Sequence, residues 1–303
     1  MTSLQLLMYF SVLICGIGIA RKVFKYVRMP IHLRWELYPV AHEGKDYGGS
    51  YYEEVEWWAK SRKRSVIDEL KFMIPEILFI RALYNHNRKL WIASFPFHGG
   101  LYVTICFLFL LVIGAVIQTF GVPVLPNSSS WFTRLLYSVT MIIGPVGFIT
   151  SLLGCIMLLF LRFADRDLKI NSTLQDYFNL FFITALLICA LATWFFIDSS
   201  FTLTREYIQS LITMKPFLSR NAMLKLELII FALFLIYFPF THMTHMFAKY
   251  FTYHKVRWED EPNIEGGKID AHVKSALQHT IKWNASHVPT GKKWSEIFKE
   301  NGE

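Results

Sequence analysis

The stretch FPFHGGLYVTICFLFLLVIGAVIQ, residues 95–118, decides the class of fold of this chain. It contains no acidic or basic residue apart from one histidine, His98, near its beginning. A helix needs roughly 20 predominantly apolar residues to cross a hydrocarbon core of ~30 Å. The stretch therefore predicts a transmembrane helix.

Four further stretches have the same character, and the chain as a whole is 53% hydrophobic and 17% aromatic. They cover residues 3–20, 135–161, 177–197 and 226–247. We expect an all-α membrane protein, built as a bundle of five transmembrane helices.

Basic residues outside these stretches predict the topology. Residues 21–93 contain 14 Lys and Arg, the tail from residue 249 contains nine, and residues 119–133 contain none. The positive-inside rule then places the N-terminus outside and the C-terminus in the cytoplasm. The first stretch lacks a small-residue cleavage pattern and is followed by basic residues, so we interpret it as an anchor. The net charge of +8 lies mostly on cytoplasmic segments, where the lipid membrane favours it, and requires no nucleic acid partner.

Four parts follow from this division. They are transmembrane helix 1 (1–20), a cytoplasmic loop (21–93), transmembrane helices 2–5 (94–248) and a cytoplasmic tail (249–303). In the loop, SVIDELKFMIPEILFIRALYN (residues 65–85) has apolar residues at helical spacing, Ser65 and Asp68 as a capping start, and Pro75 as a point of kinking. It predicts an amphipathic helix in the membrane interface. The Trp-rich tail is expected to order against this loop or to dock a partner subunit.

The four cysteines all fall inside the apolar stretches, without C-x-x-C spacing, and are expected to be buried thiols. They are Cys15, Cys106, Cys155 and Cys189. The chain itself therefore has no means to hold an iron–sulfur cluster or a covalently attached haem.

Three of the ten histidines lie within or at the edge of an apolar stretch: His98, His242 and His245. Helix 2 is predicted to run outward and helix 5 inward, which puts His98 and the other two at similar depth. Imidazoles facing each other from two helices suit bis-histidine haem ligation. Gly99 and Gly100 are expected to leave a surface without side chains where a macrocycle approaches. The plainer alternative is an ordinary hydrogen-bonded interfacial histidine.

FPFHGGLYV (95–103) together with FALFLIYFPFTHMTH (231–245) resembles the membrane cytochrome b subunit of respiratory nitrate reductase, the gamma subunit. Three further stretches are similar to the branch with the cytochrome subunits of heterodisulfide reductase and of the Dsr and Tmc complexes. They are HLRWELYPVAHEG (32–44), HNRKLWIASFPFHGG (86–100) and KWNASHVPTGKKWSEI (282–297).

The resemblance implies the ligands. His98 and His245 match the family's inner histidines, His242 stands where the family has arginine, and the outer positions fall on Leu108 and Glu227. This implies one haem b held by His98 and His245, with His242 as the alternative to His245. A second arrangement keeps two haems, by pairing His98 with His242 and His86 with His254.

Glu227 is predicted either as an ordinary interfacial carboxylate, as an ion-pair partner of Lys225 or Arg220, or as a proton acceptor beside a quinone site. No residue is assigned a catalytic role.

The expected function is that of a b-type cytochrome subunit of a quinone-linked oxidoreductase in the prokaryotic inner (cytoplasmic) membrane, not catalytic on its own. It would pass electrons between menaquinone and a cytoplasmic iron–sulfur subunit with cysteine-rich, heterodisulfide-reductase-like domains. The alternative is a membrane anchor without a redox role. A transporter is disfavoured because the spans show no internal repeat.

Overall fold

The computed structural model describes residues 1–28, 66–254, 265–285 and 288–300. They form two compact units, each described by itself. The first contains Met1–Gly16 and Leu70–Phe238, and the second contains Ile17–Glu69 and Pro239–Glu303, apart from the stretches outside the description.

The prediction of an all-α protein is confirmed for the described residues, which contain no strand, and five of their helices are long and apolar enough to cross a membrane. They are α1 (Ser3–Arg28), α4 (Arg88–Thr119), α5 (Trp131–Ala164), α7 (Leu174–Phe196) and α9 (Ala222–Tyr237), the last continued by the 3₁₀ helix η3 (Phe238–Phe240). Shorter helices in the first unit are α3 (Arg81–His86), α6 (Arg166–Ile170) and α8 (Thr202–Thr213).

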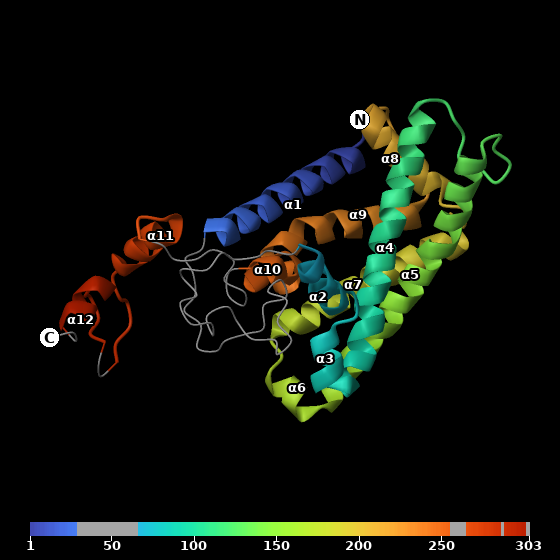
Figure 1. Cartoon of the computed structure of the whole chain (residues 1–303). Coiled ribbons are helices and arrows are strands. Elements are labelled where there is room, and N and C mark those ends of the chain that lie inside the picture. The colour runs from blue at the N-terminus through green and yellow to red at the C-terminus, as the bar shows by residue number, and fades with distance from the viewer. Residues whose placement is uncertain (29–65, 255–264, 286–287, 301–303) are drawn as a thin grey trace. The chain divides into compact units, whose positions relative to one another are not determined.

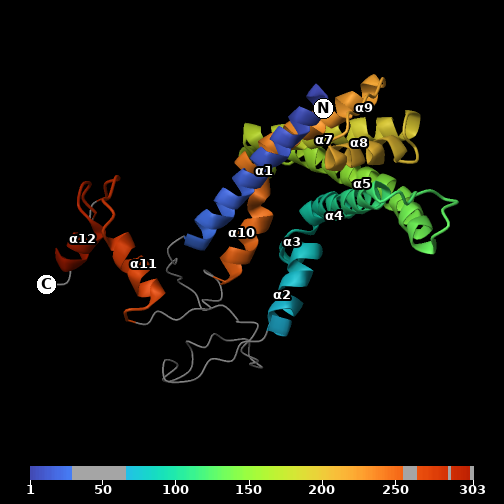
Figure 2. The same cartoon turned by 90° about the horizontal axis from the view of Figure 1, so that it is seen from above.

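In the first unit α4 and α5 run side by side over much of their length (Figure 1). Their backbones approach closely at glycines. A Cβ at Gly100 would overlap the backbone of Ser151, and one at Gly154 would overlap the backbone of Phe97. Small residues at such positions allow van der Waals contact between helices in a bilayer, where the hydrophobic effect does not drive helices together. Seen from above, α7 lies on the side of α5 away from α4, and it contacts α9 (Figure 2).

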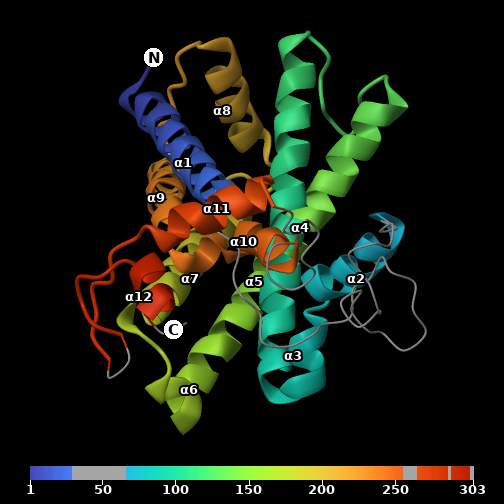
Figure 3. The same ribbon diagram turned by 60° about the vertical axis from the view of Figure 1, so that its left-hand side comes forward.

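Helix α8 lies where only a loop was expected, and it contacts the upper part of α4 (Figure 3). It also holds the first half of α1. The Gln5 amide donates to Ser210 Oγ at 3.0 Å and to the Lys215 carbonyl at 2.8 Å, and the Tyr9 hydroxyl donates to the Leu211 carbonyl at 2.5 Å. Beside these bonds is a core cluster of Met8, Tyr207, Leu224, Leu228 and Ala232.

Arg205 of α8 is almost fully buried, with 1% of its surface exposed. Its Nη1 donates to the Val124 carbonyl at 3.3 Å, and its side chain lies against Gly114 of α4. Burial lowers the pKa of the Arg205 guanidinium, whereas Asp198 nearby opposes that effect. The 198–225 segment is therefore a structured cap on the bundle.

The amphipathic segment is shorter than predicted. Helix α2 (Val66–Leu78) contains Pro75, as expected, but ends before Ile80, whose φ of 51° is left-handed and stops the helix. The Tyr102 hydroxyl donates to the Ile77 carbonyl at 2.9 Å, and Trp91 Nε1 donates to the Phe79 carbonyl at 2.8 Å. Ser65 lies outside the described residues, and the interfacial position of α2 stays a prediction.

The prediction that the fifth span reaches residue 247 is wrong. Helix α9 ends at Tyr237, and two 3₁₀ turns follow, η3 and η4 (His242–Thr244), before α10 (His245–Thr252). Pro239 has no N–H to continue the helical hydrogen bonds. Thr241 then starts η4, because its Oγ1 accepts from the Met243 N–H at 3.2 Å.

The described part of the tail forms a small hydrophobic cluster of its own, which the sequence did not predict. Between helices α11 (Lys268–Leu277) and α12 (Trp294–Glu300), Ile281 and Val288 are buried together with Ile297 of α12. The ring centroids of Trp283 and Trp294 lie 6.0 Å apart. Trp258 lies outside the described residues, and docking of a partner on the tail stays a prediction.

Candidate functional site

His98 lies in α4, half-buried, one turn after the buried Ser94. Its Nδ1 is 2.8 Å from the Ser94 carbonyl oxygen, which can only accept a hydrogen bond. Nδ1 therefore carries the proton in the neutral ring, and the lone pair is on Nε2. The ring also meets Phe97 edge to face, with centroids 5.1 Å apart, and this contact restricts its rotation.

The two glycines after His98 have different roles. A Cβ at Gly99 would meet no heavy atom within 4 Å among the described residues, so the surface there is open, as expected. The expectation for Gly100 is wrong, because its face is filled by the backbone of Ser151 on α5. Successive helical residues point about 100° apart. The open surface next to His98 is therefore on the Gly99 side of α4.

His242 and His245 belong to the second unit and are both exposed. They do not share one continuous helix, as the sequence suggested: His242 begins η4 and His245 begins α10. His245 Nδ1 lies 2.9 Å from the His242 carbonyl oxygen. As at His98, Nδ1 donates and the lone pair is on Nε2.

Lys22 of α1 stabilises the turns that carry His242 and His245. Its Nζ donates to the Thr241 carbonyl and to Thr244 Oγ1, both at 2.7 Å. A Cβ at Gly18, one turn earlier, would lie 2.5 Å from Pro239 Cβ, so α1 and η3 are in close contact. The Thr241 and Thr244 side chains that accept from or adjoin Lys22 are buried, with 2% and 1% of their surface exposed. The second unit thus holds the peptide before His245 by a charged group and by packing.

His98 and His245, in separate units, therefore each have Nδ1 next to a backbone carbonyl oxygen. A histidine that binds a metal almost always donates its other ring N–H to a carbonyl or a carboxylate, which fixes the ring and increases the basicity of the ligating nitrogen. In both rings Nε2 is the nitrogen that a metal would use. The described atoms therefore fit an axial haem ligand at each position. The His242 carbonyl orients the His245 ring, and the His242 imidazole stays the alternative ligand.

His86 and His254, the alternative second pair, are in different settings. His86 is exposed in the last turn of α3. His254 Nε2 lies 4.0 Å from Glu69 Oε2, and its ring lies 4.3 Å from that of Tyr250, centroid to centroid. The His254 nitrogen that would bind iron faces a carboxylate, which favours a structural role.

Glu227 lies in α9 and faces α7, where Thr193 and Cys189 are its neighbours. Its Oε2 and Thr193 Oγ1 are both buried, and the Thr193 hydroxyl is a polar neighbour of the Glu227 carboxyl. Within the same residues it forms no ion pair with Lys225 or Arg220, which corrects one of the three alternatives. Residues 225 and 227 point about 200° apart on a helix, so Lys225 lies on the opposite face.

The cysteine prediction holds in part. Cys155 is buried, with its thiol 3.3 Å from the Leu180 carbonyl oxygen, and Cys15 and Cys189 are half-buried. Cys106 is exposed on the surface of α4. All four are free thiols.

Sequence reasoning found the histidines but missed the groups that hold them. Ser94 acts through its backbone carbonyl, which every residue has, and therefore leaves no sequence signal. Lys22 is visible as the second charge after the first apolar stretch, but the pattern assigned it to topology alone. Its two acceptors lie more than 200 residues away.

Comparison with known protein families gives a match over the central part of the chain. A model of the nitrate reductase gamma subunit family matches residues 82–259, more than half of the chain. No curated protein and no solved structure matches the chain. The matched range contains four of the five spans and all five histidines considered above.

Proposed function

The chain belongs to the nitrate reductase gamma subunit family, whose members are haem b-containing membrane subunits of a redox complex, and on this basis we propose that it is the cytochrome b subunit of a quinone-linked oxidoreductase. The five apolar helices make it a multi-pass membrane protein. The branch with heterodisulfide reductase, Dsr and Tmc cytochromes is part of the proposal, as is the prokaryotic inner membrane.

His98 and His245 would hold one haem b through Nε2. The observation that carries this assignment is that each ring donates its Nδ1–H to a backbone carbonyl, His98 to Ser94 and His245 to His242. A bound haem supplies one-electron transfer, which no side chain of this protein provides. The open surface at Gly99 leaves room on that side of His98. The single haem is preferred because His254 faces Glu69.

The proposed topology, with the N-terminus outside, places His98 near the cytoplasmic end of α4. The chain would then exchange electrons between menaquinone and an iron–sulfur subunit on the cytoplasmic side. Its four cysteines are free thiols, in four separate transmembrane helices, so the cluster ligands would come from the partner. The basic 21–93 segment and the tail are the proposed seat for that partner.

Glu227 is proposed as the proton acceptor for quinol oxidation. Burial of a carboxylate is costly, and ionisable groups within membrane helices mark proton or ligand sites. The buried Oε2 of Glu227 lies beside the Thr193 hydroxyl, in the contact between α9 and α7. A quinol hydroxyl next to this carboxyl would donate a hydrogen bond to it and then a proton.

The test is the haem content of the purified protein by pyridine haemochrome, together with its reduced-minus-oxidised spectrum. Wild type is expected to hold one haem per chain, and His98→Ala and His245→Ala to hold none. His242→Ala and His86→Ala are the matched controls and should keep full occupancy. Two haems in wild type, with one haem lost in His86→Ala and in His254→Ala, would replace the single-haem assignment by the two-haem arrangement. A well-folded wild-type protein without haem would refute the cytochrome function and leave the membrane anchor as the function.

A further inference from the structure

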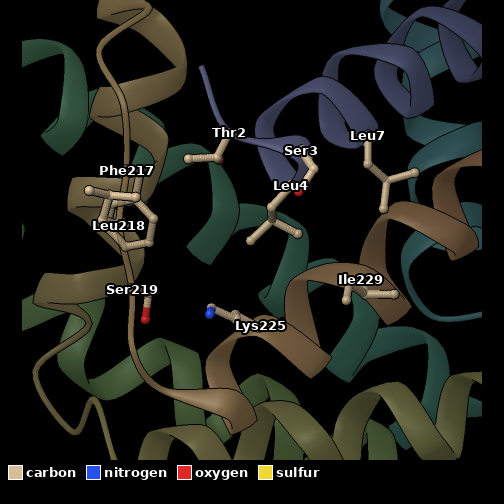
Figure 4. A pocket seen from close by; sticks show the side chains of 9 residues that line it. All are labelled: Thr2, Ser3, Leu4, Leu7, Phe217, Leu218, Ser219, Lys225 and Ile229. Atoms are coloured by element: carbon tan, nitrogen blue, oxygen red, sulfur yellow. The ribbon is translucent and has the colours of Figure 1, made fainter.

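A cavity of about 450 Å³ lies between the beginning of α1, the 217–219 segment and the beginning of α9, all within the first unit (Figure 4). Its walls are formed by Thr2, Ser3, Leu4, Leu7, Phe217, Leu218, Ser219, Lys225 and Ile229. Its volume is in the range of small-molecule sites. It lies on the opposite face of α9 from Glu227 and is therefore separate from the proposed proton acceptor.

The polar groups of this cavity gather at one end. Lys225 is exposed and extends its Nζ into the hollow, toward the Ser219 hydroxyl. Thr2 and Ser3 are at the start of α1. Among the described residues Lys225 has no ion-pair partner. The Thr2 hydroxyl donates to Gln5 Oε1 at 3.2 Å, whereas Ser219 Oγ accepts from the Asn221 N–H and keeps its own O–H to donate. The cavity thus has a positive charge, without an ion-pair partner among the described residues, next to a hydroxyl donor, which is the chemistry that binds a phosphate.

The other end is apolar and follows the helices inward. Ile229 lies one turn after Lys225 on the same face of α9, and Leu7 lies one turn after Ser3 on α1. Leu4 points into the hollow between them (Figure 4). Because both helices are membrane spans that begin here, the polar end is at the level of the lipid headgroups and the apolar end is at the level of the acyl chains.

We propose that this cavity binds one anionic phospholipid, with its phosphate at Lys225 and Ser219 and the start of an acyl chain along Leu4, Leu7 and Ile229. A quinone ring has carbonyl oxygens on opposite edges and would need polar partners on both sides. The cavity offers them at one end only. From the polar end of the cavity to its apolar end, the charge and the hydroxyl match a lipid phosphate, and the aliphatic side chains one helical turn further match the start of an acyl chain.

The lipid would also join α1 to α9 at their outer ends in the bundle, where Leu4 and Leu7 pack against the core cluster. Binding to the folded state alone raises stability in proportion to the logarithm of the ligand concentration. Phosphatidylglycerol is therefore expected to raise the melting temperature of the delipidated protein, and phosphatidylcholine, which has the same chains without net charge, is expected to raise it much less.

The experiment measures binding of phosphatidylglycerol to delipidated protein in detergent by native mass spectrometry, with melting temperature as the second readout. Lys225→Gln is expected to weaken binding about tenfold, as for loss of one charge-assisted hydrogen bond. Lys215→Gln is the matched control, because Lys215 is exposed on the same segment but does not line the cavity. Leu7→Trp should block the acyl end and weaken binding with Lys225 intact.

Three outcomes would overturn the proposal: equal binding to Lys225→Gln and Lys215→Gln, equal binding of both lipids to wild type, or displacement of the lipid by menaquinone. Inorganic phosphate that competes at millimolar concentration would show a free-anion site instead. Haem content is expected to stay unchanged in Lys225→Gln, so a failure here is distinguishable from a failure of the proposed cytochrome function.

Discussion

Replacing each of two adjacent glycines of α4 by alanine should have opposite effects on stability. At Gly100 the added Cβ would overlap Ser151 backbone atoms, which cannot rotate away as the end of a side chain can. At Gly99 the same Cβ would meet nothing within 4 Å among the described residues. Both positions are inside one helix, so the helix-propensity gain is the same for both.

The magnitudes follow from these two effects. Glycine to alanine inside a helix stabilises by roughly 0.5–1 kcal/mol. Overpacking costs about 1–3 kcal/mol, and contact with backbone places Gly100 at the upper end. Gly99→Ala should therefore raise the free energy of unfolding by about 0.5–1 kcal/mol, and Gly100→Ala should lower it by about 2 kcal/mol. The difference between the two variants isolates the cost of the α4–α5 contact.

The assay is equilibrium unfolding of the haem-free protein in mixed micelles, followed by far-ultraviolet circular dichroism. Gly16→Ala is the control for helix propensity alone, because a Cβ there also meets nothing within 4 Å among the described residues. The reasoning is refuted if Gly99→Ala and Gly100→Ala unfold alike, or if Gly99→Ala is the less stable. In haem-loaded protein Gly99→Ala should nevertheless lower occupancy, if the macrocycle approaches on that side.

Two further predictions concern charged groups. Lys22→Met should lower hydrogen-exchange protection at residues 241–245 about tenfold or more, because Thr241 and Thr244 lose charge-assisted bonds from Nζ. The pKa of the Asp165 carboxyl lies below its ordinary value. The first cause is the hydrogen bond from the Lys89 ammonium, and the second is the hydrogen bond from the Leu168 N–H. Asp165 is the N-cap of α6. Because the pKa of its carboxyl is lower in the folded protein, the ionised cap stabilises α6 above the unfolded-state pKa of about 3.9, and this stabilisation is lost as the pH falls through the folded-state pKa.

The controls are matched to each change. Lys25→Met removes a charge one turn from Lys22 and should leave protection at residues 241–245 as in wild type; equal loss in both would refute the specific role of Lys22. For the pH prediction, the protection factor of the Leu168 amide is compared at pH 6 and pH 3. Asp165→Asn should abolish the difference and Asp167→Asn should not, and a difference that persists in Asp165→Asn would contradict the assignment to this carboxyl.

The apolar stretches were sufficient to predict the number of spans, because burial in lipid imposes length and composition directly on the sequence. The ends of the elements were less predictable. Pro239 stands in an apolar run, and hydropathy alone extended α9 past it, whereas the missing N–H ended the helix at Tyr237. Helix α8 was missed because its mixed polar sequence packs on α1 and α4 through contacts distant in the chain.

For the candidate site, residue type was readable and environment was not. Histidine in an apolar run is unusual enough to be noticed. The difference between Gly99 and Gly100 depends on which face of α4 meets α5, and the two glycines look alike in the sequence. The opposite faces of Lys225 and Glu227 were predictable from helical spacing, and applying it would have excluded their ion pair at once.

The attachment of Gln5 to Ser210 has a consequence for the synthesis of the protein. The two residues are separated by 205 positions. At about 5–20 residues per second, a ribosome needs roughly 10–40 s to make the stretch between them. During this time α1 is already in the bilayer, and its glutamine amide has no partner from α8. Gln5 lies near the beginning of α1, at the level proposed above for the lipid headgroups, where water can hydrogen-bond its amide until α8 emerges. A mutation that slows the emergence of α8 would therefore delay assembly of an otherwise stable product.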